Sequence, residues 1–213
     1  GQVVLQRGEQ PLGAARAGFP APLTGMAGGA DPMGKDSASR PPGGVPWAGH
    51  AAWRDMQASL RAGLRQADAA MGPARRHAAA LAHGRDRLAD LFDHLAGATC
   101  AVCPDPCCRH AKVWLDFRDL LFIHLNGEML PPGQLRHELA GPCRYLGRQG
   151  CTLPHRSRPW ICSWYVCPGL RRALERDLPG GWRQAARLLQ RVNGRRSAME
   201  IAFLGVVEFD PAP

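Results

Sequence analysis

The sequence predicts a mainly α protein, in which a small helical domain surrounds an irregular, cysteine-rich metal-binding centre with room for a short β-hairpin. Two observations carry this prediction. Apolar residues recur at helical spacings of three and four on both sides of the centre, and all eight cysteines fall between residues 100 and 167. The chain has 213 residues and 45% hydrophobic content, so it can bury a core without disulfide staples.

The chain divides into two parts by composition. Residues 1–49 hold 11 Gly and 7 Pro with few large apolar side chains, which is typical of a disordered or surface-wrapped tail. Residues 50–213 are expected to form the helical cysteine-cluster domain. No apolar run approaches the roughly 20 residues that a membrane span requires, so we expect no membrane association.

The ordered part is expected to begin near His50 with two helices that form a helical hairpin. The dipeptide Gly72-Pro73 interrupts the periodicity, and proline is suited to the first turn of a second helix, which should end near Gly97. The apolar face of the first helix comprises Trp53, Met56, Leu60, Leu64, Ala67 and Met71, and that of the second comprises Leu81, Leu88, Leu91, Phe92 and Leu95.

Shorter elements are expected through the centre. Residues 112–115 read as a short strand, and Asp116 as the N-cap of a helix through Leu125, with Asp119 in its first turn. Residues 131–139 open with two prolines and predict a short helix. Residues 144–146 and 151–153 flank a glycine-bounded turn and predict a hairpin.

Two helices are expected to close the chain, over residues 170–176 and 181–193. The second carries apolar residues at helical spacing, including Trp182, Ala185 and Leu188. Residues 201–209 are apolar and β-branched, which fits either a closing strand or an extension of that last helix.

The cysteines fall into two groups separated by 34 residues. Disulfides are one interpretation of an even number of cysteines, but the chain shows no secretion signal and is not a miniature scaffold. Buried inert cysteines are another, although these would scatter among the helices. Metal ligation explains the clustering best, because several thiolates must converge on one centre. The candidate ligands are Cys100, Cys103, Cys107 and Cys108 in the first group, and Cys143, Cys151, Cys162 and Cys167 in the second.

The spacing favours an iron–sulfur cluster, with zinc as the alternative. Structural zinc sites prefer two short knuckles, whereas the second group has intervals of seven, ten and four residues. Cys-Pro pairs often close iron–sulfur ligand runs, and Cys103 and Cys167 are both followed by proline. We expect a 4Fe–4S cluster. Eight thiols exceed one four-ligand site, so either two centres exist or some cysteines support the ligands or are redox-active.

The motifs CAVCPDPCC, PCRYLGRQGC and RPWICSWYVC resemble those of the YkgJ-like family of bacterial cysteine-cluster proteins, described as zinc- or iron-chelating. The resemblance covers about residues 98–170 and includes a Gly-Cys pair at Cys151 and an Arg-Pro pair at Arg158. It implies that all eight cysteines belong to the metal-binding region. A related cluster occurs in flagellin lysine methylases, so the resemblance also suggests a role in peptide or protein modification.

Other residues in the cysteine region could contribute chemistry. His110 and His155 could replace or support a thiolate, although each also fits an ordinary loop histidine. Arg158 could bind cluster sulfur or an anion, or simply contact a turn carbonyl. The aromatic side chains around Cys162 could shield a cluster from water or plug a small core, and these are Trp160, Trp164 and Tyr165.

The net charge of +9 is concentrated in the C-terminal third. Residues 136–196 contain 13 Arg and 3 acidic residues, or +10, which leaves −1 for the rest of the chain. Such a field suits an acidic peptide or protein partner, although solvated helix faces are the more common explanation of such a charge excess. We do not expect nucleic-acid binding, because no aromatic platform accompanies the arginines. The arginines considered are Arg136, Arg171, Arg172, Arg183 and Arg187.

The sequence therefore supports two functional interpretations. The first is a cytoplasmic, cysteine-ligated metalloprotein with an iron–sulfur cluster, acting in peptide or protein modification. The second is a non-enzymatic zinc-binding module with a structural or metal-handling role. Redox sensing ranks behind both. No dinucleotide-binding glycine motif, phosphate-binding loop or nucleophile elbow is present, which argues against familiar nucleotide-dependent or serine-hydrolase chemistry.

Overall fold

The computed structural model describes residues 45–136, 143–148 and 150–207. Within these ranges it contains six α-helices, three short 3-10 turns and one two-stranded antiparallel sheet. The expected fold class, mainly α with a short hairpin, is confirmed. Most of the predicted tail, residues 1–49, lies outside the described residues.

The first two helices are α1, His50–Gln66, and α2, Gly72–Ala101. The start of α2 is as predicted, because Pro73 occupies its first turn. The end of α1 was predicted wrongly, because α1 stops at Gln66 and a 3-10 turn, Asp68–Ala70, occupies the residues before Gly72. The C-terminal boundary of α2 was predicted wrongly. Gly97 is exposed and helical, and α2 continues to Ala101, so Cys100 lies in its last turn. A solvated glycine weakens a helix by only about 1 kcal/mol relative to alanine, which the packing of the rest of α2 outweighs.

Helix α3, Phe117–Asn126, starts with the capping that the sequence predicts. The Asp116 carboxylate accepts from the Asp119 backbone N–H at 2.9 Å, and the Asp119 carboxylate accepts from the Asp116 N–H at 3.2 Å. The helix ends at Gly127, whose φ of 63° is the left-handed conformation that glycine adopts without strain.

The strand expected over residues 112–115 is absent from the described structure, where the segment has no regular secondary structure and pairs with no strand. The side-chain amide of Gln134 makes the hydrogen bonds to this segment that a neighbouring strand would otherwise make. Its oxygen accepts from the Leu115 N–H at 2.9 Å, and its nitrogen donates to the Leu115 carbonyl at 2.8 Å. Residues 131–136 are likewise not helical, and the remainder of that predicted helix lies outside the described residues.

The predicted hairpin is present but shorter than expected, with β1 at Leu146–Gly147 and β2 at Gly150–Cys151. Leu146 pairs with Cys151 and Gly147 with Gly150. One further backbone bond, from Thr152 N–H to the Tyr145 carbonyl at 2.8 Å, extends the pairing. A one-turn helix not predicted from the sequence, α4 at Trp160–Trp164, carries Cys162.

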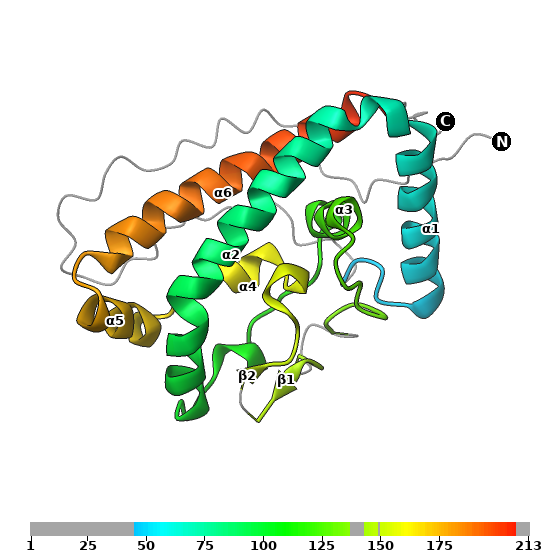
Figure 1. Ribbon diagram of the computed structural model, residues 1–213. Coiled ribbons are helices and arrows are strands. Elements are labelled where there is room, and N and C mark those ends of the chain that lie inside the picture. The colour runs from blue at the N-terminus through cyan, green and yellow to red at the C-terminus, as the bar shows by residue number, and fades with distance from the viewer. Residues whose placement is uncertain (1–44, 137–142, 149, 208–213) are drawn as a thin grey trace.

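The chain closes with α5, Pro168–Asp177, and α6, Gly181–Leu204. Of the two alternatives for residues 201–209, the helix extension is correct as far as Leu204, residues 205–207 form a turn, and residues 208–209 lie outside the described residues. Helix α6 runs antiparallel to α2 along most of its length (Figure 1), and this pair, rather than an α1–α2 hairpin, forms the frame of the domain. Gly84 makes the close approach possible, because a Cβ atom there would lie 2.5 Å from Val192 Cγ2.

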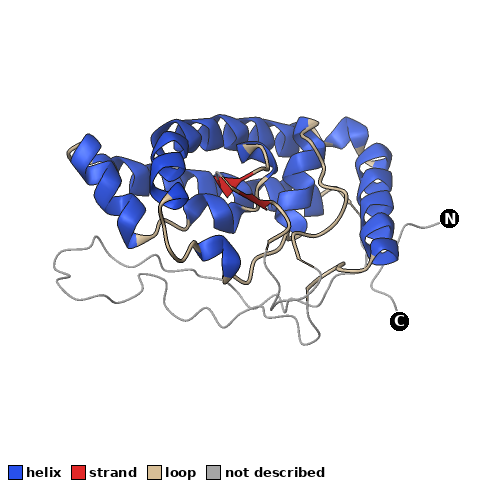
Figure 2. Ribbon diagram, turned by 90° about the horizontal axis from the view of Figure 1, so that it is seen from below, coloured by secondary structure: helices blue, strands red, loops and turns tan. Residues whose placement is uncertain are grey.

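The hydrophobic core lies between this frame, α1 and α3. It includes Leu60, Met71, Leu81, Leu120, Phe122, Leu174, Val192, Met199 and Phe203. The hairpin lies near the C-terminal end of α2 and below α4, whereas α5 lies on the other side of α2 (Figure 1). Figure 2 shows the hairpin in front of the helices when the molecule is seen from below. The cysteine region is thus held at one end of a helical frame.

Candidate metal centre

The first cysteine group lies at the C-terminal end of α2 and in the loop that follows it. Cys100 is in the last helical turn, and the Cys103 N–H donates to the Cys100 carbonyl at 3.3 Å. Cys107 and Cys108 begin a 3-10 turn, in which the Cys107 carbonyl accepts from the N–H groups of His110 and Ala111. These backbone hydrogen bonds hold the four thiols of the first group on one short, ordered stretch of chain.

The second group comes from four separate positions. Cys143 precedes the hairpin, Cys151 lies on β2 and Cys162 on α4. Cys167 is the N-cap of α5, where its sulfur accepts from the Leu170 N–H at 3.4 Å. Each of these cysteines lies within or next to an element of secondary structure. The four thiols are therefore attached to backbone that has defined hydrogen bonds.

Direct contacts bring the two groups side by side. The Cys143 N–H donates to the Cys108 carbonyl at 3.5 Å. Gly169 shows that Cys167 also lies beside the last turn of α2. A Cβ atom placed on Gly169 would be 3.7 Å from Thr99 Cγ2, on α2, and 3.8 Å from Cys167 Sγ. Residues 35 or more positions apart in the sequence therefore meet in one region, as metal ligation from two loops requires.

The thiols also influence one another electrostatically. Burial raises the pKa of Cys100, and the neighbouring Cys167, Cys108 and Cys103 raise it further. Protein atoms around the Cys162 thiol exclude water from it and so raise its pKa, and the nearby Cys108 raises it further. Part of the Cys162 residue nevertheless reaches solvent. Without a metal, deprotonation of several thiols at once is thus disfavoured.

The adjacent pair Cys107 and Cys108 behaves differently. A hydrogen bond from the Cys108 thiol lowers the pKa of Cys107, and the same bond, together with burial, raises the pKa of Cys108. Cys107 is therefore the thiol of this pair that ionises first. A thiolate is the form that ligates metal.

All eight cysteines are free thiols. Nevertheless, within the part of the chain that the structure describes, no three Cys, His, Asp or Glu side chains are arranged as a metal-binding group. The donor set fits a thiolate-ligated metal in its chemistry and its shared location. The side chains are gathered in one region without forming a coordination shell.

Arg136 supplies a positive charge beneath the first group. It was considered as part of a docking surface, and this was wrong: the side chain is 2% exposed and lies inside the domain. Its Nη2 donates to the Cys108 carbonyl at 2.8 Å, while Nε and Nη1 have no hydrogen-bond partner among the described residues. No carboxylate of the described residues pairs with Arg136, and a buried cation without such a partner is costly. A negatively charged centre at the adjacent thiols would compensate it.

The segment that carries Cys162 is held against α2 by Arg85, a residue that sequence reasoning missed. Arg85 is 3% exposed, and its Nη2 donates to the carbonyls of His155, at 2.9 Å, and Arg158. Its guanidinium also lies 4.9 Å from the centre of the Phe122 ring. Burial lowers the pKa of Arg85 to about 10, which leaves it charged at neutral pH.

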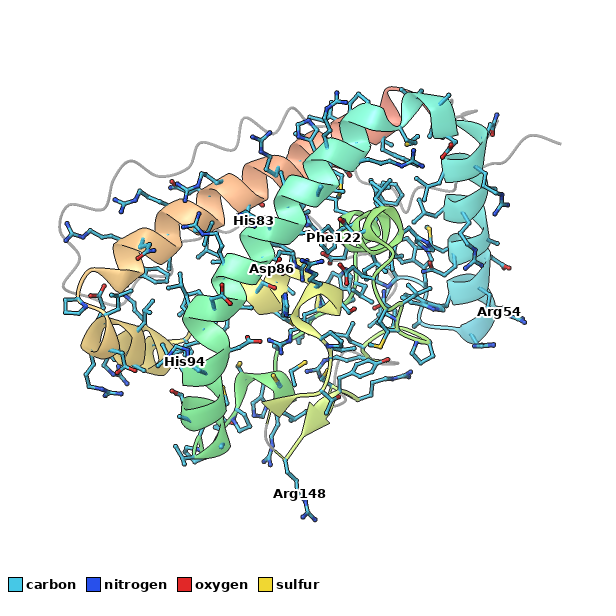
Figure 3. The ribbon with its side chains drawn as sticks, viewed as in Figure 1. Arg54, His83, Asp86, His94, Phe122 and Arg148 are labelled. Atoms are coloured by element: carbon cyan, nitrogen blue, oxygen red, sulfur yellow. The ribbon has the colours of Figure 1, made fainter. Side chains whose placement is uncertain are left out.

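Asp86, the next residue on α2, makes a second attachment to the same segment. Arg156 binds its carboxylate in a bidentate manner, with Nε 2.7 Å from Oδ1, and His155 Nε2 lies 2.8 Å from Oδ1. The hydrogen bond from Arg156 is the main reason that the pKa of Asp86 falls to about 2. Figure 3 shows Asp86 on the side of α2 that faces α4.

A buried charge cluster fixes the start of α4. The Asp119 carboxylate accepts from the Trp160 N–H at 3.0 Å and from Arg196 Nη2 at 3.2 Å, and Arg196 also binds Asp116. Burial, and then the charge of Asp116, raises the pKa of Asp119 to about 6, while Arg196 opposes the rise. Asp119, predicted only as an acidic residue in the first turn of its helix, thus also joins α3 to α4 and α6.

The other predicted site residues have mixed outcomes. His110 pairs with Asp105 at the surface, and His155 is engaged by Asp86, so neither is brought to a thiol by these contacts. Arg158 contacts a turn carbonyl, with Nε 3.0 Å from the Leu153 oxygen, and Nη1 lies 2.9 Å from Asp93 Oδ1. Burial raises the pKa of Cys151, and the charge of Arg158 opposes this rise. The turn contact is therefore confirmed, and contact with cluster sulfur or an anion stays a prediction.

The aromatic residues around Cys162 divide between core and surface. Trp160 is buried in the main core, Trp164 packs against that core, and Tyr165 is 47% exposed. The rings of Trp164 and Tyr165 meet edge to face, with centroids 6.2 Å apart. Of the C-terminal arginines, Arg171 lies over the Trp182 ring at 4.9 Å, whereas Arg172, Arg183 and Arg187 are exposed.

Comparisons with protein-family models, curated proteins and solved structures gave no match to this chain. The resemblance to the YkgJ-like family stays a prediction that rests on the motifs alone. Among the described helices, none is both long enough and apolar enough to cross a membrane.

Proposed function

We propose that this protein binds an iron–sulfur cluster through cysteines of both groups, and that the cluster ties the two loops to the helical frame. The residues that would hold it are drawn from Cys100, Cys103, Cys107 and Cys108 and from Cys143, Cys151, Cys162 and Cys167. When bound, such a cluster supplies one-electron chemistry at a potential set by its surroundings. A 4Fe–4S cluster is the form proposed.

The observation that carries the proposal is the buried guanidinium of Arg136 beside the thiols. Its Nε and Nη1 have no partner among the described residues. The hydrogen bond with Cys107, together with burial, raises the pKa of Cys108, burial raises the pKa of Cys143, and the charge of Arg136 opposes both rises. A cation in this position favours thiolate over thiol. It also suits a cluster with net negative charge better than an uncharged set of thiols.

The supports around Cys162 favour the same conclusion. Arg85, Asp86 and Asp119 attach residues 155–163 to α2 and α3 by hydrogen bonds to charged groups. Such outer contacts limit the movement of a ligand loop in metal sites. Free thiols at all eight positions suit a reducing compartment, so a cytoplasmic location belongs to the proposal.

The first test is chemical. Protein purified without oxygen should contain iron and acid-labile sulfide in similar amounts and absorb visible light. Cys103→Ser and Cys162→Ser should lose iron together with thermal stability, since metal binding contributes to folding. Val102→Ser is the matched control, because Val102 is 81% exposed between two candidate ligands and should keep its iron.

Two results would overturn the proposal. Cysteine variants that retain full metal and stability would show that the thiols are not ligands. Colourless protein with stoichiometric zinc would instead support the non-enzymatic zinc-binding module. The resemblance extends the proposal to modification of a peptide or protein, and this step becomes testable only once the metal is known.

A further inference from the structure

A groove between α2 and α6 concentrates positive charge away from the cysteines. It forms an open depression with a volume of about 140 Å³. We call it the cationic groove and define it by its lining residues, which are Ala80, His83, Gly84, Arg87, Leu188, Arg191, Val192 and Arg195. Figure 3 shows His83 on the side of α2 that faces α6. The lining contains three arginines and a histidine but no carboxylate.

Close packing of the two helices creates the floor of the groove. Gly84 lies against Val192, where a Cβ atom would have no room at 2.5 Å from Val192 Cγ2. Val192 and Leu188 are 2% and 4% exposed, so the floor is apolar and well packed. The exposed Arg87 and Arg191 rise from opposite helices on either side of it.

The arginines continue along α6 beyond the groove. Arg183, Arg187, Arg191 and Arg195 occupy every fourth position and are all exposed. Consecutive members lie about 6 Å apart along the helix axis. Like charges at this spacing repel and destabilise a helix, so the row is unfavourable for folding unless an anion compensates it.

No carboxylate of the described residues compensates this row. Arg195 contacts only His77, with 3.4 Å between Nη1 and Nδ1, which adds another basic group. The acids on the same two helices are engaged elsewhere: Asp86 with Arg156, Asp93 with Arg158 and Glu200 with Arg118. Asp90, three residues beyond Arg87, forms no ion pair within the described ranges, but it lies outside the groove lining.

We propose that the cationic groove binds an acidic segment of a partner protein that also carries apolar side chains. Guanidinium groups on both rims match carboxylates in bidentate geometry. The apolar surface open to a partner is small and is provided by the exposed Ala80 at the edge of the floor, which suits a small aliphatic side chain of a peptide. A phosphodiester backbone has no such group to place there. No Phe, Tyr or Trp lines the groove, so it lacks the stacking platform of single-stranded nucleic-acid sites. The inference does not depend on the metal.

The experiment measures binding of a labelled amphipathic peptide to the full chain by fluorescence anisotropy. The peptide carries glutamates at every fourth position and leucines on the adjacent stripe. Arg191→Glu/Arg195→Glu should weaken its binding by at least about tenfold, because complementary charges become repulsive. Arg54→Glu/Arg148→Glu is the control with the same change in net charge. Both residues are exposed on α1 and the hairpin turn and point away from the groove (Figure 3).

The outcomes are distinguishable. Strong loss in the groove variant, with little change in the control, supports the proposal. Equal loss in both variants overturns it, because the peptide then senses only the net charge. Absence of binding by the unaltered protein also overturns it. Tighter binding of an oligothymidylate of equal charge, lost in the same groove variant, would assign the groove to nucleic acid instead. Arg87→Glu, on the opposite rim, tests the groove should the double variant fold poorly.

Discussion

The ion pair between Asp86 and Arg156 makes a quantitative prediction about how the cysteine segment is attached. Replacement of Asp86 by Asn removes the charge that Arg156 binds in a bidentate manner and that His155 also contacts. The pKa of Asp86 lies at about 2 instead of the ordinary 3.8, which corresponds to an interaction of up to about 2.5 kcal/mol.

Solvent reduces that value. The side chains of Asp86 and Arg156 are 32% and 35% exposed, so screening should leave about 1 kcal/mol at neutral pH. Because the pKa is lowered on folding, the stabilisation is complete above pH 4 and is lost as the pH falls from about 4 towards 2. The difference between the unaltered protein and Asp86→Asn should therefore be constant near neutrality and vanish in acid.

Urea unfolding of both proteins at several pH values measures this difference directly. Asp90→Asn, an exposed carboxylate one turn further along α2 without an ion pair in the described structure, is the control and should change stability little. A double-mutant cycle with Arg156→Met assigns the energy to the pair. If Asp86→Asn and Asp90→Asn behaved alike, or if the Asp86 effect persisted unchanged in acid, the attachment would not be electrostatic.

Three further predictions concern the frame and its contacts. Gly84→Ala should lower the free energy of unfolding by about 1–3 kcal/mol, because the added methyl group meets Val192. Gly97→Ala should raise the free energy of unfolding by about 0.5–1 kcal/mol, because nothing lies within 4 Å of the added methyl group. Urea unfolding of the two variants measures both changes. Arg85→Met should lower the free energy of unfolding by about 3 kcal/mol, because it removes the charged group that binds the carbonyls of residues 155 and 158. Amide hydrogen exchange should accelerate in residues 155–163 more than in other segments, and equal acceleration everywhere would contradict this local role. Leu60→Ala, at a fully buried position of α1, should lower the free energy of unfolding by about 2–5 kcal/mol, and a cost below 1 kcal/mol would place α1 outside the cooperative core.

Local signals in the sequence predicted most of the helical structure. The periodic apolar residues of α1 and α2 are buried or pack against the core, and Asp116 caps α3 as expected. These features depend on residues within a few positions of one another, so the periodicity and the capping chemistry are sufficient to indicate them. The hairpin near Cys151 was predicted for the same reason, through the glycines that bound its turn.

The failures occur where a distant side chain replaces a local partner. Residues 112–115 have strand-like composition, but the amide of Gln134 binds the Leu115 backbone and no strand forms there. Helix α4 is too short for a periodic signal, and its start is fixed by Asp119 from another helix. Arg136 looks like one more exposed arginine in the sequence, yet its side chain is buried below Cys108.

By itself, then, the sequence determined the helical class, the position of the cysteine region and the identity of its eight possible ligands, because composition and short-range spacing encode them. Only the tertiary structure decided that α2 packs on α6, that Arg85 and Asp86 hold the Cys162 segment, and that a row of arginines borders an apolar floor. The physical reason is that burial and ion pairing join residues about 70 or more positions apart, and no local pattern records which distant groups will meet.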